Sequence, residues 1–181
     1  MKICISGLSG SGKNSIGLLV AKKLGMKLIN PTFKTLAKKS KISLMEFHKK
    51  AEQNSSIDKN FDKALIKQAK GNCVVTTWLG PWMIKDADLK IWLNASAAAR
   101  AQRIAQRDGM TSEEAQQHIS QRDESNRQRY LRIYGIDIYD HSGFDLVINT
   151  EKFHPKQSAE IICCAAKAKG FKKGASKQKK R

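Results

Sequence analysis

The chain has 181 residues, of which 40% are hydrophobic, and a formal net charge of +18. This size and composition suit one folded domain and exclude a disordered chain, and no apolar run approaches the roughly 18 residues that a membrane-spanning helix needs. The opening stretch MKICISGL turns polar too early for a secretory signal, so we expect a cytoplasmic protein that does not contact a membrane.

Short apolar runs rich in β-forming residues predict five strands, at 2–6, 27–30, 73–78, 89–94 and 145–150. Helical spacing and helix-start signals predict helices at 13–24, 31–39, from 43, 57–70, 96–107, from 111 and from 155. Two of these starts are capping boxes, Ser43 with Glu46 and Thr111 with Glu114. Strands that alternate with helices predict an α/β fold, with a parallel sheet covered on both faces.

The segment GLSGSGKNS stands between the first strand and the first helix. It satisfies the G-x-x-x-x-G-K pattern, in which backbone N–H groups and a helix N-terminus bind phosphate oxygens. Lys13 is expected to be catalytic, because a lysine here neutralises charge on the β- and γ-phosphates. The expected ATP- and phosphate-binding residues are Gly7, Leu8, Ser9, Gly10, Ser11, Gly12, Lys13, Asn14 and Ser15.

The residue after this lysine is unusual for such a loop. Ser or Thr commonly follows the lysine and binds magnesium, whereas here Asn14 follows it and Ser15 supplies the next hydroxyl. We therefore expect Ser15 to bind Mg²⁺, directly or through water. No strand ends in an aspartate suited to a Walker B motif. NTEK at 149–152 is not the guanine-reading N-K-x-D, and DHSG at 140–143 fits D-x-x-G but follows no convincing strand, so a GTPase fails on two motifs.

The basic residues are segregated by type. Seven of the eight arginines fall between Arg100 and Arg132, and arginine offers the bidentate geometry that suits phosphate. Lysine dominates elsewhere, with nine lysines against one acid in residues 22–50 and a basic tail at 170–181. Two interpretations fit the lysines: a polyanionic partner such as RNA, or a solvated face with a solubilising tail.

The stretches ADLKIWLNA, RIAQRDG, QRDESNRQRYLRIYGIDI and DLVINT make the chain resemble the archaeal-type cytidylate kinases. The resemblance implies the P-loop nucleoside monophosphate kinase fold, as a monomer with one kinase-like domain over 1–169. Within it, residues 30–70 would form a helical monophosphate-binding arm and residues 107–132 an arginine-rich lid. Such enzymes transfer the γ-phosphoryl group of ATP to CMP or dCMP and use Mg²⁺.

The resemblance also implies roles for single residues. The catalytic lid arginines would be Arg107, Arg122 and Arg129, with Arg103 in support.

The acceptor side departs from the family pattern. Relatives usually have an arginine where Lys34 stands, and Glu-Gly-Arg where Thr76, Thr77 and Trp78 stand. A charge-assisted hydrogen bond contributes about 1.5–3 kcal/mol, so the absence of one such bond and the weakening of another would cost on the order of a hundredfold in acceptor use. Trp78 could stack on a base or simply pack in the cleft wall. The expected acceptor-binding residues are Lys34, Asp58, Asp62 and Trp78.

Two functions therefore compete. The first is a cytidylate kinase-like phosphotransferase with a partly degenerate acceptor site. The second is a catalytically weak or inactive protein of the same fold that binds nucleotide and docks on RNA or the ribosome. The residues expected to contact RNA are Lys38, Lys39, Lys41, Lys172, Lys173, Lys177, Lys179, Lys180 and Arg181.

Overall fold

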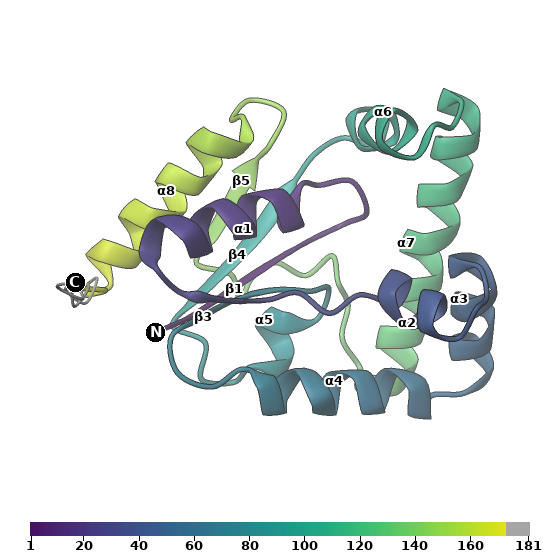
Figure 1. The fold of residues 1–181 in the computed structure, drawn as a ribbon, viewed down its shortest axis with the longest axis horizontal. Helices are drawn as coiled ribbons and strands as arrows, with labels where there is room; N and C mark the ends of the chain where they lie inside the picture. The colour runs from purple at the N-terminus through teal and green to yellow at the C-terminus, as the bar shows by residue number, and fades with distance from the viewer. Residues whose placement is uncertain (173–181) are drawn as a thin grey trace, which may run out of the picture.

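A computed structural model describes residues 1–172, and a single parallel sheet forms its centre (Figure 1). The strands lie in the order β2-β3-β1-β4-β5, and every neighbouring pair is parallel. They are β1 (Lys2–Gly7), β2 (Lys27–Ile29), β3 (Cys73–Thr76), β4 (Leu89–Asn94) and β5 (Leu146–Asn149). The five-stranded parallel sheet predicted from the sequence is confirmed.

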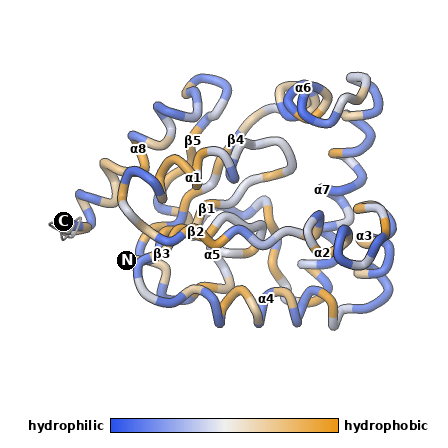
Figure 2. The backbone as a smooth tube through the Cα atoms, viewed as in Figure 1, coloured by the Kyte–Doolittle hydropathy of each residue, from blue (hydrophilic) through white to orange (hydrophobic). Residues whose placement is uncertain are grey.

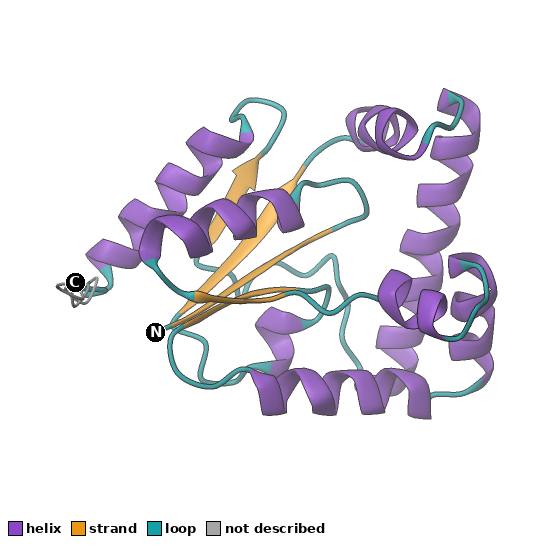
Figure 3. Cartoon of the chain, in the orientation of Figure 1, coloured by secondary structure: helices purple, strands orange, loops and turns teal. Residues whose placement is uncertain are grey.

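Helices connect the strands and cover both faces of the sheet (Figure 3). They are α1 (Lys13–Leu24), α2 (Phe33–Lys39), α3 (Leu44–Gln53), α4 (Ser56–Gln68), α5 (Gly80–Met83), α6 (Ala97–Asp108), α7 (Ser112–Tyr134) and α8 (Pro155–Ala168). Both predicted capping boxes are formed, at the start of α3 and of α7. Among residues 1–172, no helix is both long enough and apolar enough to cross a membrane.

Several element boundaries differ by one or two residues from the sequence-based prediction. The helix expected from Pro31 begins at Phe33, because the Thr32 side chain caps it by accepting from the Thr35 N–H. The strand expected over 73–78 ends at Thr76, so the two residues after it belong to a loop. Helix α5 was not predicted, since a four-residue helix is too short to show a periodic pattern.

The two faces of the sheet pack against different helices. Ile3 and Ile5 of β1 belong to the core formed with α1 and α8, whereas Cys4 between them belongs to a second cluster with Leu65 of α4. This alternation follows from the period of two along a strand. Burying each such side chain contributes about 1.5–3 kcal/mol, so both layers stabilise the sheet that carries the phosphate-binding loop.

Helix α7 is the longest helix and is largely hydrophilic (Figure 2). It packs against α6 through a small apolar cluster that includes Ile104 and Ile119, and it contacts α3 on its other side (Figure 1). Because so little of α7 is apolar, polar side chains must supply much of what fixes its position.

Gly17 of α1 gives a test of the packing between α1 and the sheet. A Cβ atom at Gly17 would lie 2.1 Å from Cγ2 of Thr76. We expect Gly17→Ala to destabilise the fold by about 1–2 kcal/mol, because overpacking outweighs the higher helix propensity of alanine. Urea unfolding would measure the loss. Gly143→Ala is the control, because no atom lies within 4 Å of the added methyl group; equal stability of the two variants would contradict the prediction.

Candidate active site

A cleft of about 990 Å³ lies beyond the carboxyl ends of β1 and β3. Ligands of open α/β sheets bind at this edge. The phosphate-binding loop lines one side, α2 to α4 line a second side, and α6 with α7 line a third. Of the predicted loop residues, Ser9 to Ser15 line the cleft and Gly7 and Leu8 do not.

Gly10 and Gly12 show why the loop needs glycine. Gly10 has φ +80°, and a Cβ there would lie 2.6 Å from the backbone oxygen of Arg100. Gly12 has φ +91° and precedes α1 directly. The first backbone N–H groups of α1 have no partner within the helix, so the loop and the helix N-terminus together can bind an anion.

Lys13 bends back over the loop. Its Nζ donates to the backbone oxygens of Gly7 (2.9 Å) and Leu8 (3.2 Å) and lies 5.1 Å from the centre of the Trp78 ring. Burial, and next the nearby guanidinium of Arg122, lower the pKa of Lys13 from 10.5 to about 7. The contacts of Lys13 Nζ are neutral carbonyl oxygens, and a bound phosphate would supply a negatively charged partner.

A buried ion pair ties the loop to α6 and α7. Arg100 donates to Asp123 at 2.5 Å and to the backbone oxygen of Ser9 at 3.0 Å. Asp123 in turn accepts from the Ser9 N–H at 3.2 Å. Both side chains are 8% exposed, and the sequence had singled out neither residue.

The Arg122 side chain has no hydrogen bond or ion pair within residues 1–172, although it lines the cleft and is half-buried. Burial lowers the pKa of Arg122 from its ordinary value. An arginine held in this way is a strong candidate to bind phosphate oxygens.

Arg107 and Arg103 already have partners within the protein. Arg107 lines the cleft and forms an ion pair with the half-buried Asp108, which also accepts from Lys34 at 3.4 Å. The supporting Arg103 also lines the cleft and holds Thr150, donating to its backbone oxygen at 2.7 Å.

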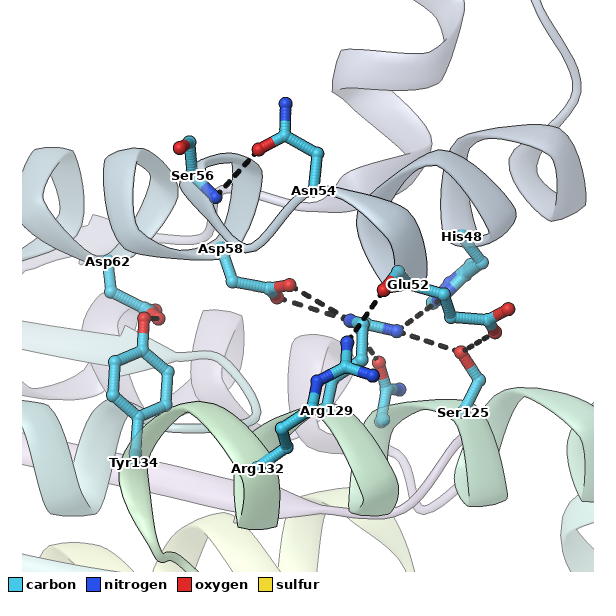
Figure 4. Close-up of polar contacts among 11 residues, drawn as sticks. His48, Glu52, Asn54, Ser56, Asp58, Asp62, Ser125, Arg129, Arg132 and Tyr134 are labelled. Carbon is cyan, nitrogen blue, oxygen red and sulfur yellow. Dashed lines mark hydrogen bonds and ion pairs between the residues drawn. The ribbon is translucent and has the colours of Figure 1, made fainter.

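Arg129 does not line the cleft and is 1% exposed. All five of its N–H groups have acceptors: two on Asp58 and one each on His48, Ser125 and Asn126 (Figure 4). No N–H group remains for a substrate phosphate, so this geometry differs from the catalytic role that the resemblance implied. The same contacts explain why Asp58 lies outside the cleft lining.

The remaining predicted acceptor residues line the cleft. Asp62 accepts a hydrogen bond from the Tyr134 hydroxyl at 2.7 Å, and burial raises the pKa of Asp62 to about 6. Lys34 is exposed at the mouth, and Trp78 is half-buried beside Lys13. Trp78 therefore forms part of the cleft wall.

Buried polar atoms without a partner are concentrated around this cleft. Of ten such side-chain atoms in residues 1–172, seven belong to residues that line it: Ser9, Ser11, His48, Thr76, Thr77, Arg122 and Asn126. An unsatisfied buried polar group costs about 1–3 kcal/mol, so their concentration here indicates a polar ligand.

The expected RNA contacts are only partly described. Lys38, Lys39, Lys41 and Lys172 are exposed, whereas Lys173, Lys177, Lys179, Lys180 and Arg181 lie outside the described residues. Ser15, the expected magnesium ligand, is exposed on the first turn of α1 and lines the cleft.

Comparison with known proteins decides the family. The model of the cytidylate kinase-like family matches residues 2–152. The chain belongs to the cytidylate kinase-like family. The cytidylate kinase of Pyrococcus horikoshii is 44% identical over 166 residues, covering 90% of this chain and 86% of that protein. That of Sulfurisphaera tokodaii is 42% identical over 167 residues, covering 90% and 93%.

Solved structures of two kinases have the same fold as this chain. Shikimate kinase from Acinetobacter baumannii superposes with a TM-score of 0.63 at 15% identity, covering 94% of this chain and 95% of that one. Deoxyadenosine kinase from M. mycoides superposes with a TM-score of 0.54 at 20% identity, covering 93% and 100%. The chain therefore has the P-loop kinase fold and belongs to a family of nucleotide kinases.

Sequence reasoning missed four residues that shape this cytidylate kinase-like cleft: His48, Arg100, Asp123 and Asn126. Asp123 and Asn126 belong to the QRDESNRQRY string, and Arg100 is the first residue of the arginine-rich stretch. No pattern in the sequence pointed to His48.

Lys13 also allows a test by pH. In the unfolded chain its pKa returns to the ordinary value of 10.5, so between pH 7 and 10.5 the unfolded state binds more protons and wild-type stability rises with pH. Lys13→Met should stabilise the ligand-free protein by about 1–2 kcal/mol near pH 6, allowing for partial solvent screening, and much less near pH 10.

Urea unfolding of both proteins at each pH measures this gain. Lys63→Met, at an exposed position of α4, is the matched control and should show no such pH-dependent gain. A gain for Lys13→Met that is the same at both pH values would contradict the prediction.

Proposed function

We propose that this protein transfers the γ-phosphoryl group of ATP to CMP or dCMP. The main support is the composition of the cleft, which is lined by the phosphate-binding loop, Lys13 and Arg122. Within residues 1–172, the Arg122 side chain and several other buried polar atoms there have no partner. Membership of the cytidylate kinase-like family supports the choice of a cytidine monophosphate as acceptor.

The loop and α1 would bind the phosphates of ATP. Residues 9–15 line the cleft. The first turn of α1 has no acidic residue, so the positive end of the helix dipole is free to attract a phosphate in the cleft. Lys13 would leave the carbonyl oxygens of Gly7 and Leu8 and bind the β- and γ-phosphates instead. The negative charge of the phosphate would then stabilise the buried ammonium group of Lys13.

Arg122 would neutralise the phosphoryl group in transit. Phosphoryl transfer depends mainly on alignment and charge neutralisation, and a guanidinium without a protein partner needs no bond broken before it binds. Arg107, which is largely exposed, would join it by exchanging the half-buried Asp108 for phosphate. Closure of the lid residues 107–132 against the arm residues 30–70 would exclude water from the transfer.

A magnesium ion fits the donors present. Mg²⁺ usually keeps several waters and takes one or two protein ligands beside substrate phosphates. Ser15 offers one hydroxyl on the cleft wall, and no group of three or more metal-binding side chains exists among residues 1–172. We therefore expect Ser15 to hold the ion directly or through water. The ion would supply further neutralisation of phosphate charge.

The acceptor site is proposed to be partly degenerate. Lys34 is exposed and already contacts Asp108, and Trp78 brings no charge to the cleft. The acceptor phosphate would therefore be held mainly by Arg122 and Lys34, while Asp62 would contact the nucleoside. We propose a monomer with one domain over 1–169, followed by the basic segment 170–181.

RNA docking is a second candidate function, and the arm supports it. All nine lysines of residues 22–50 are exposed, and only Lys23 and Lys34 have ion-pair partners within residues 1–172. Lys38, Lys39 and Lys41 lie together on α2 and the turn after it. Such a group would suit a phosphate backbone of RNA or the ribosome.

ADP formation from ATP with CMP, dCMP, UMP or AMP tests the kinase proposal. We expect turnover that requires CMP or dCMP and is abolished in Lys13→Ala. Arg122→Ala should lower kcat by about 10²–10³-fold and change the Kd for ATP by less than about threefold. Arg127→Ala is the matched control, because it removes an arginine of α7 outside the cleft lining. Equal losses of turnover and ATP binding in Arg122→Ala would overturn the role of Arg122.

Salt dependence tests RNA docking. Binding of a labelled single-stranded RNA, measured between about 50 and 200 mM salt, should weaken steeply as salt rises. Replacing Lys38, Lys39 and Lys41 by alanine should reduce the slope of log K against log salt by about 2. The same change at Lys59, Lys63 and Lys67, exposed on α4, is the charge-matched control. Binding that ignores salt, or equal effects of both triple variants, would refute docking through Lys38, Lys39 and Lys41.

A further inference from the structure

The contacts of Arg129 determine the hydrogen-bonding roles of two cleft residues, His48 of α3 and Asn126 of α7 (Figure 4). Neither was expected from the sequence. His48 and Asn126 are each 2% exposed, and each has one buried polar atom without a partner. What those two atoms can bind follows from the chemistry of the arginine between them.

The arginine sets the tautomer of His48. A guanidinium can only donate, and Nη1 of Arg129 lies 3.3 Å from Nδ1 of His48, so Nδ1 must be the acceptor. The proton of the neutral ring is then on Nε2, the atom without a partner. Burial, and next the charges of Arg122 and Arg129, lower the pKa of His48 to about 3, so the ring stays neutral near pH 7.

The same arginine sets the orientation of the Asn126 amide. Nη2 of Arg129 donates to Oδ1 of Asn126 at 2.9 Å, which leaves the Nδ2 amino group as the unpartnered end. The arrangement is firmly held, because Arg129 also forms a bidentate pair with Asp58 at 2.9 and 3.2 Å. Two neutral donors are therefore fixed before any ligand binds.

The surroundings of these donors suit a base better than a phosphate. Phe33 and Phe61 line the same part of the cleft, and the Phe33 ring lies 5.4 Å from the ring of His48. Leu44 and Met45 at the start of α3 also line it. An apolar wall with a few fixed hydrogen-bonding groups is typical of sites for flat heterocycles.

We infer that His48 Nε2–H and Asn126 Nδ2–H donate to the pyrimidine ring of the acceptor monophosphate, with Arg129 as the residue that positions both. The matching acceptors on cytosine are the 2-carbonyl oxygen and N3. Uracil has a hydrogen on N3, so one donor would face another donor and remain unpaired. The inference rests on the proposed function, since it assigns the acceptor end of that cleft.

Substituting His48 separates donation from packing. His48→Phe keeps a ring and removes the donor, and it should raise KM for CMP about tenfold while KM for ATP stays unchanged. His48→Gln can present an amide N–H near the Nε2 position and should recover most of the loss. The preference for CMP over UMP should fall in His48→Phe. His141→Phe is the control, because His141 packs on Trp92 and does not line the cleft.

A measurement on the unreacted protein makes the test independent of turnover. With ¹⁵N-labelled histidine, the His48 resonances should show a neutral ring with the proton on Nε2, and CMP alone should shift them more than ATP alone does. His48→Gln identifies the signals by their loss. A proton on Nδ1, or no shift on saturation with CMP, would overturn the inference.

The two proposals fail in different ways. Turnover with CMP together with an unchanged KM in a folded His48→Phe variant would overturn the role of His48 and leave the kinase function in place. Absence of turnover with every monophosphate would overturn the kinase function, and the response of His48 to CMP would still decide whether the base binds there.

Discussion

Burying a guanidinium is costly unless acceptors and an opposite charge surround it, and the acceptors around Arg129 and Arg100 hold helix α7 in place. At one point Arg129 is enclosed by acceptors from α3, α4 and α7 itself. About two turns earlier, Asp123 accepts from the buried Arg100 and from the backbone N–H of Ser9. Since removing one partner of a buried pair typically costs about 3–5 kcal/mol, these two contacts hold α7 to the arm and to the phosphate-binding loop.

Directly before Asp123, α7 carries Arg122, whose side chain has no hydrogen-bond or ion-pair partner within residues 1–172. Arg122 and Lys13 both lose solvation in the cleft, which lowers the pKa of each, and the charge of Arg122 lowers the pKa of Lys13 further. A carboxylate beside these two cations would stabilise the empty cleft. The nearby Asp123 is already paired with Arg100. The positive charge is thus kept at some cost to stability, as expected where binding a phosphate offsets that cost.

Local signals in the sequence predicted the local structure well. The capping boxes at Ser43 and Thr111, the glycine that ends α1 and the loop before Lys13 each act over a few residues, so each could be recognised directly. The pairing of Arg129 with Asp58 spans 71 positions and depends on how the arm folds against α7. For the same reason the arginine motif identified Arg129 as a residue of interest without revealing that its donors are all used internally.

The two ends of the cleft differ in the way they can recognise a ligand. Near the loop, Lys13 and Arg122 provide charge, which attracts any phosphate strongly and distinguishes poorly between nucleotides. Toward the arm, where Trp78 brings no charge, the buried groups without partners are neutral: the hydroxyls of Thr76 and Thr77 and the donors of His48 and Asn126. Neutral groups held in fixed orientations discriminate by matching donor to acceptor, because a mismatched ligand leaves a buried group unpaired. With the partly degenerate phosphate site that we propose, a larger share of the discrimination would fall to contacts with the base.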